Sequence, residues 1–340
     1  MNRHINEKLN NAQRRKAAVL FAMVLCLVLV ATGLTGCGEY MKDNGKPLIV
    51  CTIYPEYDWL MNVLGDEADN YNIKLILDGS TDIHSYQPTA ADIAAIASCD
   101  LLIYPGGEST VWIEDALEGK VNEDMRVIQL IECLGEDALN EHDHGEDEAG
   151  AEHDHHHSDE EIAYDEHVWL SLKNAEVFVH EISHALGEIS PEKAGVFEEN
   201  AHEYEEKLHE LDEAFLQVVN EAEYNTLMFA DRFAFRYMME DYSIEHYEAF
   251  TGCSADAEAG FETVAYLAEK LNEEKLPAVV ILENTDERLA ETIIDTAEKP
   301  DTEILVLDSM QSITAEQKEE GYSYLSAMEY NLGVIKEALN

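Results

Sequence analysis

Residues 47–53, Pro47-Leu-Ile-Val-Cys-Thr-Ile53, form a short apolar run that ends at Tyr54-Pro55. An apolar run of this length predicts a buried strand, and the proline marks the turn that ends it. The next residues, 56–64, have the pattern of a helix. Short strands that alternate with helices are typical of a parallel α/β sheet.

The same alternation recurs on both sides of a helical middle segment. Before that segment, the pattern predicts strands at 71–77, 100–104 and 126–130 and helices at 89–98 and 111–117. After it, the pattern predicts strands at 226–229, 244–250, 278–282 and 304–307, and helices at 233–242, 261–272, 289–297 and 324–339. In the middle, residues 173–186 and 191–222 predict two helices, the second with apolar residues at spacings of three and four.

The predicted fold class is therefore α/β, with two lobes that each contain a central parallel sheet and are joined by a long linker helix. We assign 37–170 to the N-terminal lobe, 171–222 to the linker helices and 223–340 to the C-terminal lobe. Ligands of such sheets bind at the carboxyl ends of the strands. We therefore expect a site in the cleft between the lobes.

The first 36 residues predict an export signal. A basic block, Arg14-Arg15-Lys16, precedes the apolar run 17–31, and Leu34-Thr35-Gly36-Cys37 follows. This order is typical of a cleaved signal peptide, and its last four residues resemble a bacterial lipobox, which implies that Cys37 carries a lipid. The alternative, a transmembrane anchor, is disfavoured because a span needs about 20 apolar residues. We expect an extracytoplasmic lipoprotein anchored to the cell membrane, with or without an outer membrane around it.

The charge balance limits the partners. Lys and Arg number 21 against 72 Asp and Glu, a formal net charge of −51. This excludes a nucleic-acid partner, because phosphate contacts need cations. A field of carboxylates attracts metal cations, although a merely solubilising acidic surface would have the same composition. The cysteines form no C-x-x-C pair, and Cys51 and Cys99 lie in apolar runs where a free thiol behaves as a small hydrophobe.

Histidine is concentrated in one segment. Residues 136–161 are mostly acidic or histidine, which predicts a mobile loop within the N-terminal lobe. Its imidazoles alternate with carboxylates, a pattern that binds zinc, nickel or copper without a fixed geometry. We predict an auxiliary metal-binding loop that uses His142, His144, His153, His155, His156 and His157.

Two further histidines lie at the ends of predicted elements. His84 lies in Asp82-Ile-His-Ser-Tyr-Gln-Pro88, and His167 lies in Asp165-Glu-His-Val-Trp-Leu170. A third pattern, His180-Glu-Ile-Ser-His184, matches the H-E-x-x-H sequence of zinc proteases, with both histidines on one helical face. The last pattern keeps a zinc-dependent hydrolase open as an alternative.

The order of these motifs resembles the zinc and manganese substrate-binding lipoproteins of ABC importers, the zinc-uptake and adhesin-lipoprotein family. The resemblance spans nearly all of the chain after Cys37. It rests on Thr52-Ile-Tyr-Pro55, the contexts of His84 and His167, and the His-rich loop between them. In the second lobe it rests on Ser254-Ala-Asp-Ala-Glu258, Leu307-Asp-Ser309 and Tyr324-Leu-Ser-Ala-Met-Glu-Tyr-Asn331.

The resemblance implies that His84, His167 and Asp308 are metal ligands. One position departs from the family pattern: Arg232, in Arg232-Phe-Ala-Phe-Arg-Tyr237, stands where the family has a third ligand. Arginine stays protonated and cannot bind a metal. Asp231 is our expected replacement. Glu258 or water could also fill the position, or Arg232 could pair with a carboxylate and hold the lobes together.

We therefore expect a binding protein rather than an enzyme. It would capture Zn²⁺, with Mn²⁺ as a possible cargo, and deliver the ion to the permease of an ABC importer. We expect it to bind no nucleic acid and to act as a monomer. Two other functions stay open on sequence alone. One is the hydrolase built on His180 and His184, and the other is a metal buffer in which the His-rich loop is the whole function.

Overall fold

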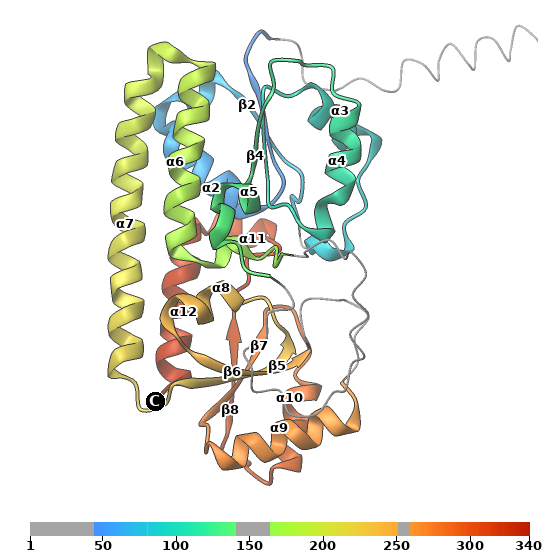
Figure 1. Ribbon diagram of the computed structural model, residues 1–340, viewed down its shortest axis with the longest axis vertical. Coiled ribbons are helices and arrows are strands. Elements are labelled where there is room, and N and C mark those ends of the chain that lie inside the picture. The colour runs from blue at the N-terminus through green and yellow to red at the C-terminus, as the bar shows by residue number, and fades with distance from the viewer. Residues whose placement is uncertain (1–43, 80, 141–163, 251–258) are drawn as a thin grey trace, which may run out of the picture. The chain divides into compact units, whose positions relative to one another are not determined.

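A computed structural model describes residues 44–79, 81–140, 164–250 and 259–340 (Figure 1). Several expectations from the sequence lie outside these ranges: the signal peptide, Cys37, the six histidines of the auxiliary loop, and the segment Ser254–Glu258. Residues 46–340 form one compact unit that contains both predicted sheets.

The N-terminal lobe is built on a four-stranded parallel sheet. Its strands lie in the order β2-β1-β3-β4, with β1 at Leu48–Cys51, β2 at Asn72–Leu75, β3 at Leu101–Tyr104 and β4 at Arg126–Gln129. All four residues of β3 are buried, as are the last three of β1, because helices cover a parallel sheet on both faces. These helices are α2 (Tyr54–Leu64), α3 (Ala90–Ser98), α4 (Val111–Glu118) and the short α5 (Leu130–Leu134).

The helices of this lobe begin where side chains satisfy their first backbone N–H groups. Thr89 and Asp92 form a capping box at the start of α3. At α2, the buried carboxylate of Glu56 accepts the N–H groups of Thr52, at 2.6 Å, and Ile53, at 3.2 Å. These contacts hold the sharp turn between β1 and α2 that Tyr54-Pro55 indicated. Cys51 and Cys99 are free thiols with no exposed surface, as expected.

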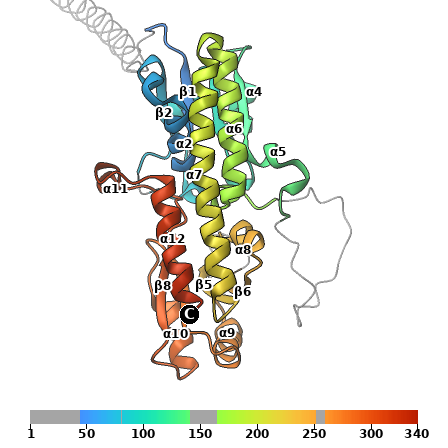
Figure 2. The same cartoon turned by 90° about the vertical axis from the view of Figure 1, so that its left-hand side faces the viewer.

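The linker is a pair of helices, α6 (Leu172–Ile189) and α7 (Ala194–Glu221), which lie side by side in Figures 1 and 2. The apolar face expected on the second of these helices is confirmed by burial of Phe197, Ala201, Tyr204, Leu208, Leu211 and Phe215. Helix α7 reaches both lobes. Near its start Asn200 donates to the Val63 carbonyl of α2, and near its end Phe215 stacks on Tyr242 with ring centroids 5.0 Å apart.

The C-terminal lobe repeats the strand order of the first, as β6-β5-β7-β8, again all parallel. Its strands are β5 (Thr226–Arg232), β6 (Glu245–Phe250), β7 (Ala278–Leu282) and β8 (Glu303–Leu307). Its helices are α8 (Arg236–Tyr242), α9 (Phe261–Glu273), α10 (Arg288–Thr296), α11 (Ala315–Glu319) and α12 (Tyr324–Ala338). The predicted α/β class with two parallel sheets is confirmed.

Two boundaries in this lobe differ from the sequence prediction. Strand β5 continues to Arg232, three residues past the expected end, and α8 begins at Arg236 rather than at Phe233. The cause is an irregular register between Phe229 and Arg232, which carries the strand further along β6. The strand thus delivers Asp231 and Arg232 to the carboxyl end of the sheet.

The last helix links the two lobes. Tyr324, at the start of α12, is fully buried and meets Trp59 of α2 edge-on, with ring centroids 5.0 Å apart. Its N–H donates to Asp58, and its hydroxyl donates to the Trp169 carbonyl. The Trp169 indole in turn donates to the carbonyl of Ser309. These contacts connect the end of the second lobe to the core of the first.

Among the helices that the structure describes, none combines the length and the apolar character that crossing a membrane requires.

Candidate metal centre

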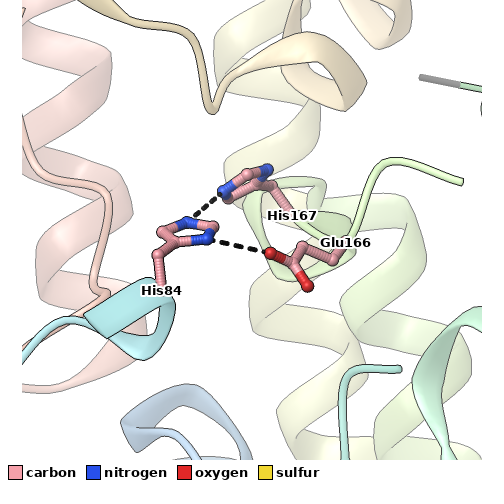
Figure 3. A group of neighbouring side chains, drawn as sticks. All are labelled: His84, Glu166 and His167. Carbon is pink, nitrogen blue, oxygen red and sulfur yellow. Dashed lines mark hydrogen bonds and ion pairs between the residues drawn. The ribbon is translucent and has the colours of Figure 1, made fainter. Parts of the chain in front are cut away.

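Two imidazoles meet at the carboxyl side of the first lobe. His84 lies on the 3-10 turn Ile83–Ser85, and His167 directly precedes the 3-10 turn Val168–Leu170. Their Nε2 atoms are 3.2 Å apart. Figure 3 shows the two rings with these nitrogens facing each other. The His84 side chain is 11% exposed and that of His167 is 4% exposed, so both rings lie almost entirely inside the protein.

The other ring nitrogen of each histidine faces a carboxylate. Nδ1 of His84 lies 3.0 Å from Oε1 of Glu166 and 2.8 Å from Oγ of Ser109. Nδ1 of His167 lies 2.8 Å from Oδ1 of Asp165. A carboxylate at Nδ1 favours the tautomer with its proton there, which leaves the Nε2 lone pair for a metal. The two Nε2 atoms therefore present their lone pairs toward one point.

The backbone around each histidine is held in the same way. His84 N–H donates to Oδ1 of Asp82 at 2.9 Å, and His167 N–H donates to Oδ1 of Asp165 at 2.8 Å. In both cases the acceptor stands two residues earlier, an Asp-x-His pattern that closes a local turn. Each ring is thus placed by its own short segment of sequence.

Glu166 completes the cluster, and the sequence analysis did not assign it a role. Its Oε2 accepts the Ser109 N–H at 3.0 Å, and its Oε1 accepts the Ser109 hydroxyl. Burial alone would raise the pKa of Glu166, but its contact with His84 and the proximity of His167 outweigh burial and lower that pKa. Gly107 makes room for this side chain, since a Cβ there would lie 2.6 Å from the Glu166 Cβ.

Within the described part of the chain, His84, Glu166 and His167 are the one group of three or more such residues whose ligand atoms all lie within 4.8 Å of one another. Imidazole nitrogen and carboxylate oxygen are ordinary zinc ligands. Two ligands of a tetrahedral zinc with bonds of 2.0–2.1 Å lie about 3.3 Å apart. The Nε2–Nε2 distance of 3.2 Å matches that spacing, so the two histidines fit a bound zinc ion. Glu166 faces Nδ1 of His84 and orients that ring.

The two aspartates expected as ligands are engaged elsewhere. Asp308, just after β8, accepts the Met310 N–H at 2.9 Å and the Tyr322 hydroxyl at 2.7 Å. Asp231 accepts the N–H groups of Arg232, at 2.7 Å, and Leu282, at 2.9 Å. Neither belongs to the cluster around His84 and His167. Metal ligation by Asp308 and Asp231 stays a prediction.

Arg232 forms an ion pair, one of the arrangements that the sequence left open. Its Nη1 lies 2.9 Å from Oδ2 of Asp82, so the pair joins β5 of the second lobe to the segment before His84 in the first. Asp82 also accepts the His84 backbone N–H, as described above. The alternative that uses Glu258 falls outside the described residues.

The H-E-x-x-H motif lies away from this arrangement. His180 and His184 are both exposed on α6, and His180 is 3.8 Å from Glu205 of α7. Neither histidine belongs to the cluster found in the described ranges. A zinc protease requires both imidazoles of this motif on one ion, so the structure gives the hydrolase interpretation no support.

Two parallel α/β lobes joined by paired helices, with buried imidazoles that share one focus, define a two-lobe metal-binding protein. Residues 49–338 match the profile of the family described as the zinc-uptake complex component A, periplasmic, and the chain belongs to that family. The resemblance inferred from the motifs is therefore confirmed at the level of the family.

Named relatives agree with this assignment. The zinc-binding lipoprotein AdcA of Streptococcus pneumoniae serotype 4 is 31% identical over 328 residues, which is 95% of this chain but 61% of the relative. The chain thus spans less than two thirds of AdcA. The high-affinity zinc uptake system protein ZnuA of Bacillus subtilis (strain 168) is 28% identical over 96% of this chain and 98% of its own length.

A solved structure extends the comparison to the fold. The zinc-bound ZnuA-like domain of Streptococcus pneumoniae AdcA superposes with a TM-score of 0.68 and 29% identity, over 87% of this chain and 99% of that domain. The shared fold covers both lobes, because the match extends over most of the described residues.

Proposed function

We propose that this chain is an extracytoplasmic binding protein that captures zinc and delivers it to the permease of an ABC importer. The observation that carries the proposal is the pair of buried Nε2 atoms 3.2 Å apart, each on a ring whose Nδ1 faces a carboxylate. Family membership and the names of the relatives support the same cargo.

The ligand chemistry favours zinc over manganese. Zinc readily takes imidazole nitrogen in a four-coordinate site, whereas manganese favours a larger set of oxygen ligands. Two almost fully buried imidazoles meet the first requirement. Asp308 and Asp231 remain the proposed carboxylate ligands from the second lobe, where a rearrangement of their hydrogen bonds on metal binding would be required.

The remaining parts of the proposal concern the surroundings of the site. Cys37 would carry the lipid that anchors the protein outside the cell membrane, as the name of the lipoprotein relative suggests. The six histidines of residues 142–157 would collect zinc for the buried site. The protein would act as a monomer without catalysis, and its partner would be the permease.

The test is a calorimetric titration with zinc, and separately with manganese, of residues 37–340 from which 141–161 have been deleted. We expect one tight zinc site, weaker manganese binding, and loss of the zinc site in His84→Ala and His167→Ala. The matched control is His202→Ala, because His202 is an exposed imidazole on α7 with a side chain 73% accessible.

Two outcomes would contradict the proposal. Absence of tight binding after deletion of 141–161, with tight binding before it, would make the loop the binder and the protein a buffer. Equal loss of binding in His202→Ala and His84→Ala would show that the buried pair has no special role.

A further inference from the structure

Arg232, which stands where the family has a third ligand, lies close to the proposed metal position. Asp82 contacts Arg232 through Oδ2, at 2.9 Å, and its Oδ1 lies 4.0 Å from Nε2 of His84. That nitrogen is the one that faces His167. The same carboxylate therefore borders both the guanidinium and the atom that would bind zinc.

Asp82 is held from the second lobe by a further side chain. With the amide of Gln311 oriented so that its nitrogen faces the carboxylate, it donates to both Asp82 oxygens, at 3.1 and 3.2 Å. Gln311 is buried, and the side chains of Arg232 and Asp82 are only 24% and 25% exposed. The ion pair is thus largely shielded from water. Charges in such a shielded position interact more strongly than charges on an open surface.

The physical consequence follows from the signs of the charges. Arginine remains positively charged at every physiological pH. Its charge repels a divalent cation nearby, and its pairing with Asp82 neutralises the carboxylate that would otherwise attract that cation. Both effects act in the same direction, against metal binding.

We infer that Arg232 is a built-in competitor of the zinc ion: paired with Asp82 across the lobes, it lowers the affinity of the site and speeds release of the metal. This inference rests on the proposed function and adds a determinant of affinity to it. A receptor that must surrender its cargo to a permease benefits from such an internal counter-charge, since tight binding alone would slow delivery.

The experiment measures zinc affinity by chelator competition, and zinc release by stopped flow, on residues 37–340 with the loop present. The variants are Arg232→Gln, Arg232→Met, Arg232→Lys, Asp82→Asn and the double variant Arg232→Gln/Asp82→Asn. The control is Arg126→Gln, because Arg126 also pairs with a carboxylate, that of Glu188 at 2.6 Å, but in an exposed ion pair between β4 and α6.

We expect Arg232→Gln and Arg232→Met to bind zinc about 10-fold more tightly and to release it correspondingly more slowly. Arg232→Lys should stay near the wild type because it keeps the charge. Asp82→Asn should bind more weakly, and the gain from Arg232→Gln should shrink in that background. Arg126→Gln should leave affinity unchanged.

Unchanged or weaker binding in both neutral variants would overturn the inference and make Arg232 a purely structural tie. An equal gain in Arg232→Lys would also overturn it, because size rather than charge would then be responsible. If the wild type shows no tight site, the proposed function fails. The inference on Arg232 then stands if Arg232→Gln gains a site that His84→Ala removes, and falls with it if no variant binds.

Discussion

Two aspartates place the histidines of the site by the same local device. Asp82 and Asp165 each accept the backbone N–H of the histidine two residues later, and Asp165 also contacts Nδ1 of its ring. For His84 the contact at Nδ1 comes instead from Glu166, 82 residues along the chain. One imidazole is thus oriented by its neighbour in sequence and the other by a distant residue.

At this scale we predict that Glu166→Gln weakens zinc binding by about 10- to 100-fold, the usual effect of losing the group that orients a metal-binding histidine. The amide cannot offer the negative charge that keeps the proton on Nδ1 of His84. Calorimetry on the loop-deleted protein measures the change. Glu108→Gln is the matched control, because Glu108 is exposed on the neighbouring turn Glu108–Thr110. Equal affinities for the two variants would contradict the prediction.

The sequence was informative about His84 and His167 because their motifs are local. It was silent on Glu166, although the repeated Asp-x-His pattern could have indicated Asp165. Only the fold brings Glu166 to His84, through the space that Gly107 leaves. For Asp231 the sequence predicted a metal ligand, but in the structure its carboxylate accepts two backbone N–H groups. This arrangement depends on the pairing of β5 with β7, which the sequence of β5 alone does not show.

At the scale of single elements, the start of α2 contains an unusual buried acid. Glu56 is fully buried, and burial raises its pKa from 4.5 to about 8, although hydrogen bonds from Thr52 and Ile53 partly oppose the rise. A carboxyl group whose pKa is higher in the folded state holds its proton more tightly there. Its contribution to the free energy of unfolding is complete below pH 4.5 and is lost as the pH rises toward 8.

We therefore predict that the free energy of unfolding of wild type falls by up to about 1.4 kcal/mol per pH unit from this group between roughly pH 5 and 8. Glu56→Gln removes the titrating group and should flatten this part of the profile. Urea unfolding at several pH values, without metal, gives the slopes. Glu114→Gln, an exposed acid in the first turn of α4, should keep the wild-type slope. Parallel profiles for wild type and Glu56→Gln would rule out the buried acid as the cause.

The elements that the sequence missed are short. Helices α5 and α11 each have five residues, fewer than two turns, so they show no apolar periodicity to detect. The extension of β5 to Arg232 was missed for another reason. It depends on an irregular register with β6, which is a property of two segments together rather than of either alone.

At the scale of the whole molecule, the formal net charge of −51 creates a field that attracts cations. We predict that the association rate of zinc falls about 10-fold or more as salt rises from 10 to 500 mM, values chosen so that the Debye length shrinks from about 30 Å to a few ångströms. The dissociation rate should change much less, because it depends on contacts inside a shielded site. Stopped-flow mixing measures both rates.

That measurement uses calcium-free buffers with a counter-ion that does not bind zinc, so that competition between ions does not contribute to the salt effect. A salt effect confined to the dissociation rate would show that the acidic surface plays no part in capture.

The two-lobe organisation was itself predictable, because strands and helices alternate twice along the chain. The contacts of Tyr324 with Trp59 and Asp58 were not predictable, since they join residues far apart in sequence.

These contacts bear on how the protein is made. The N-terminal lobe, which provides both histidines, has Tyr324 buried against Trp59 and bonded to Asp58. A chain that emerges residue by residue, from a ribosome or through an export channel, therefore leaves this lobe with a gap in its core until residue 324 has appeared. The lobe that provides both histidines can therefore complete its core only when nearly the whole chain has been made.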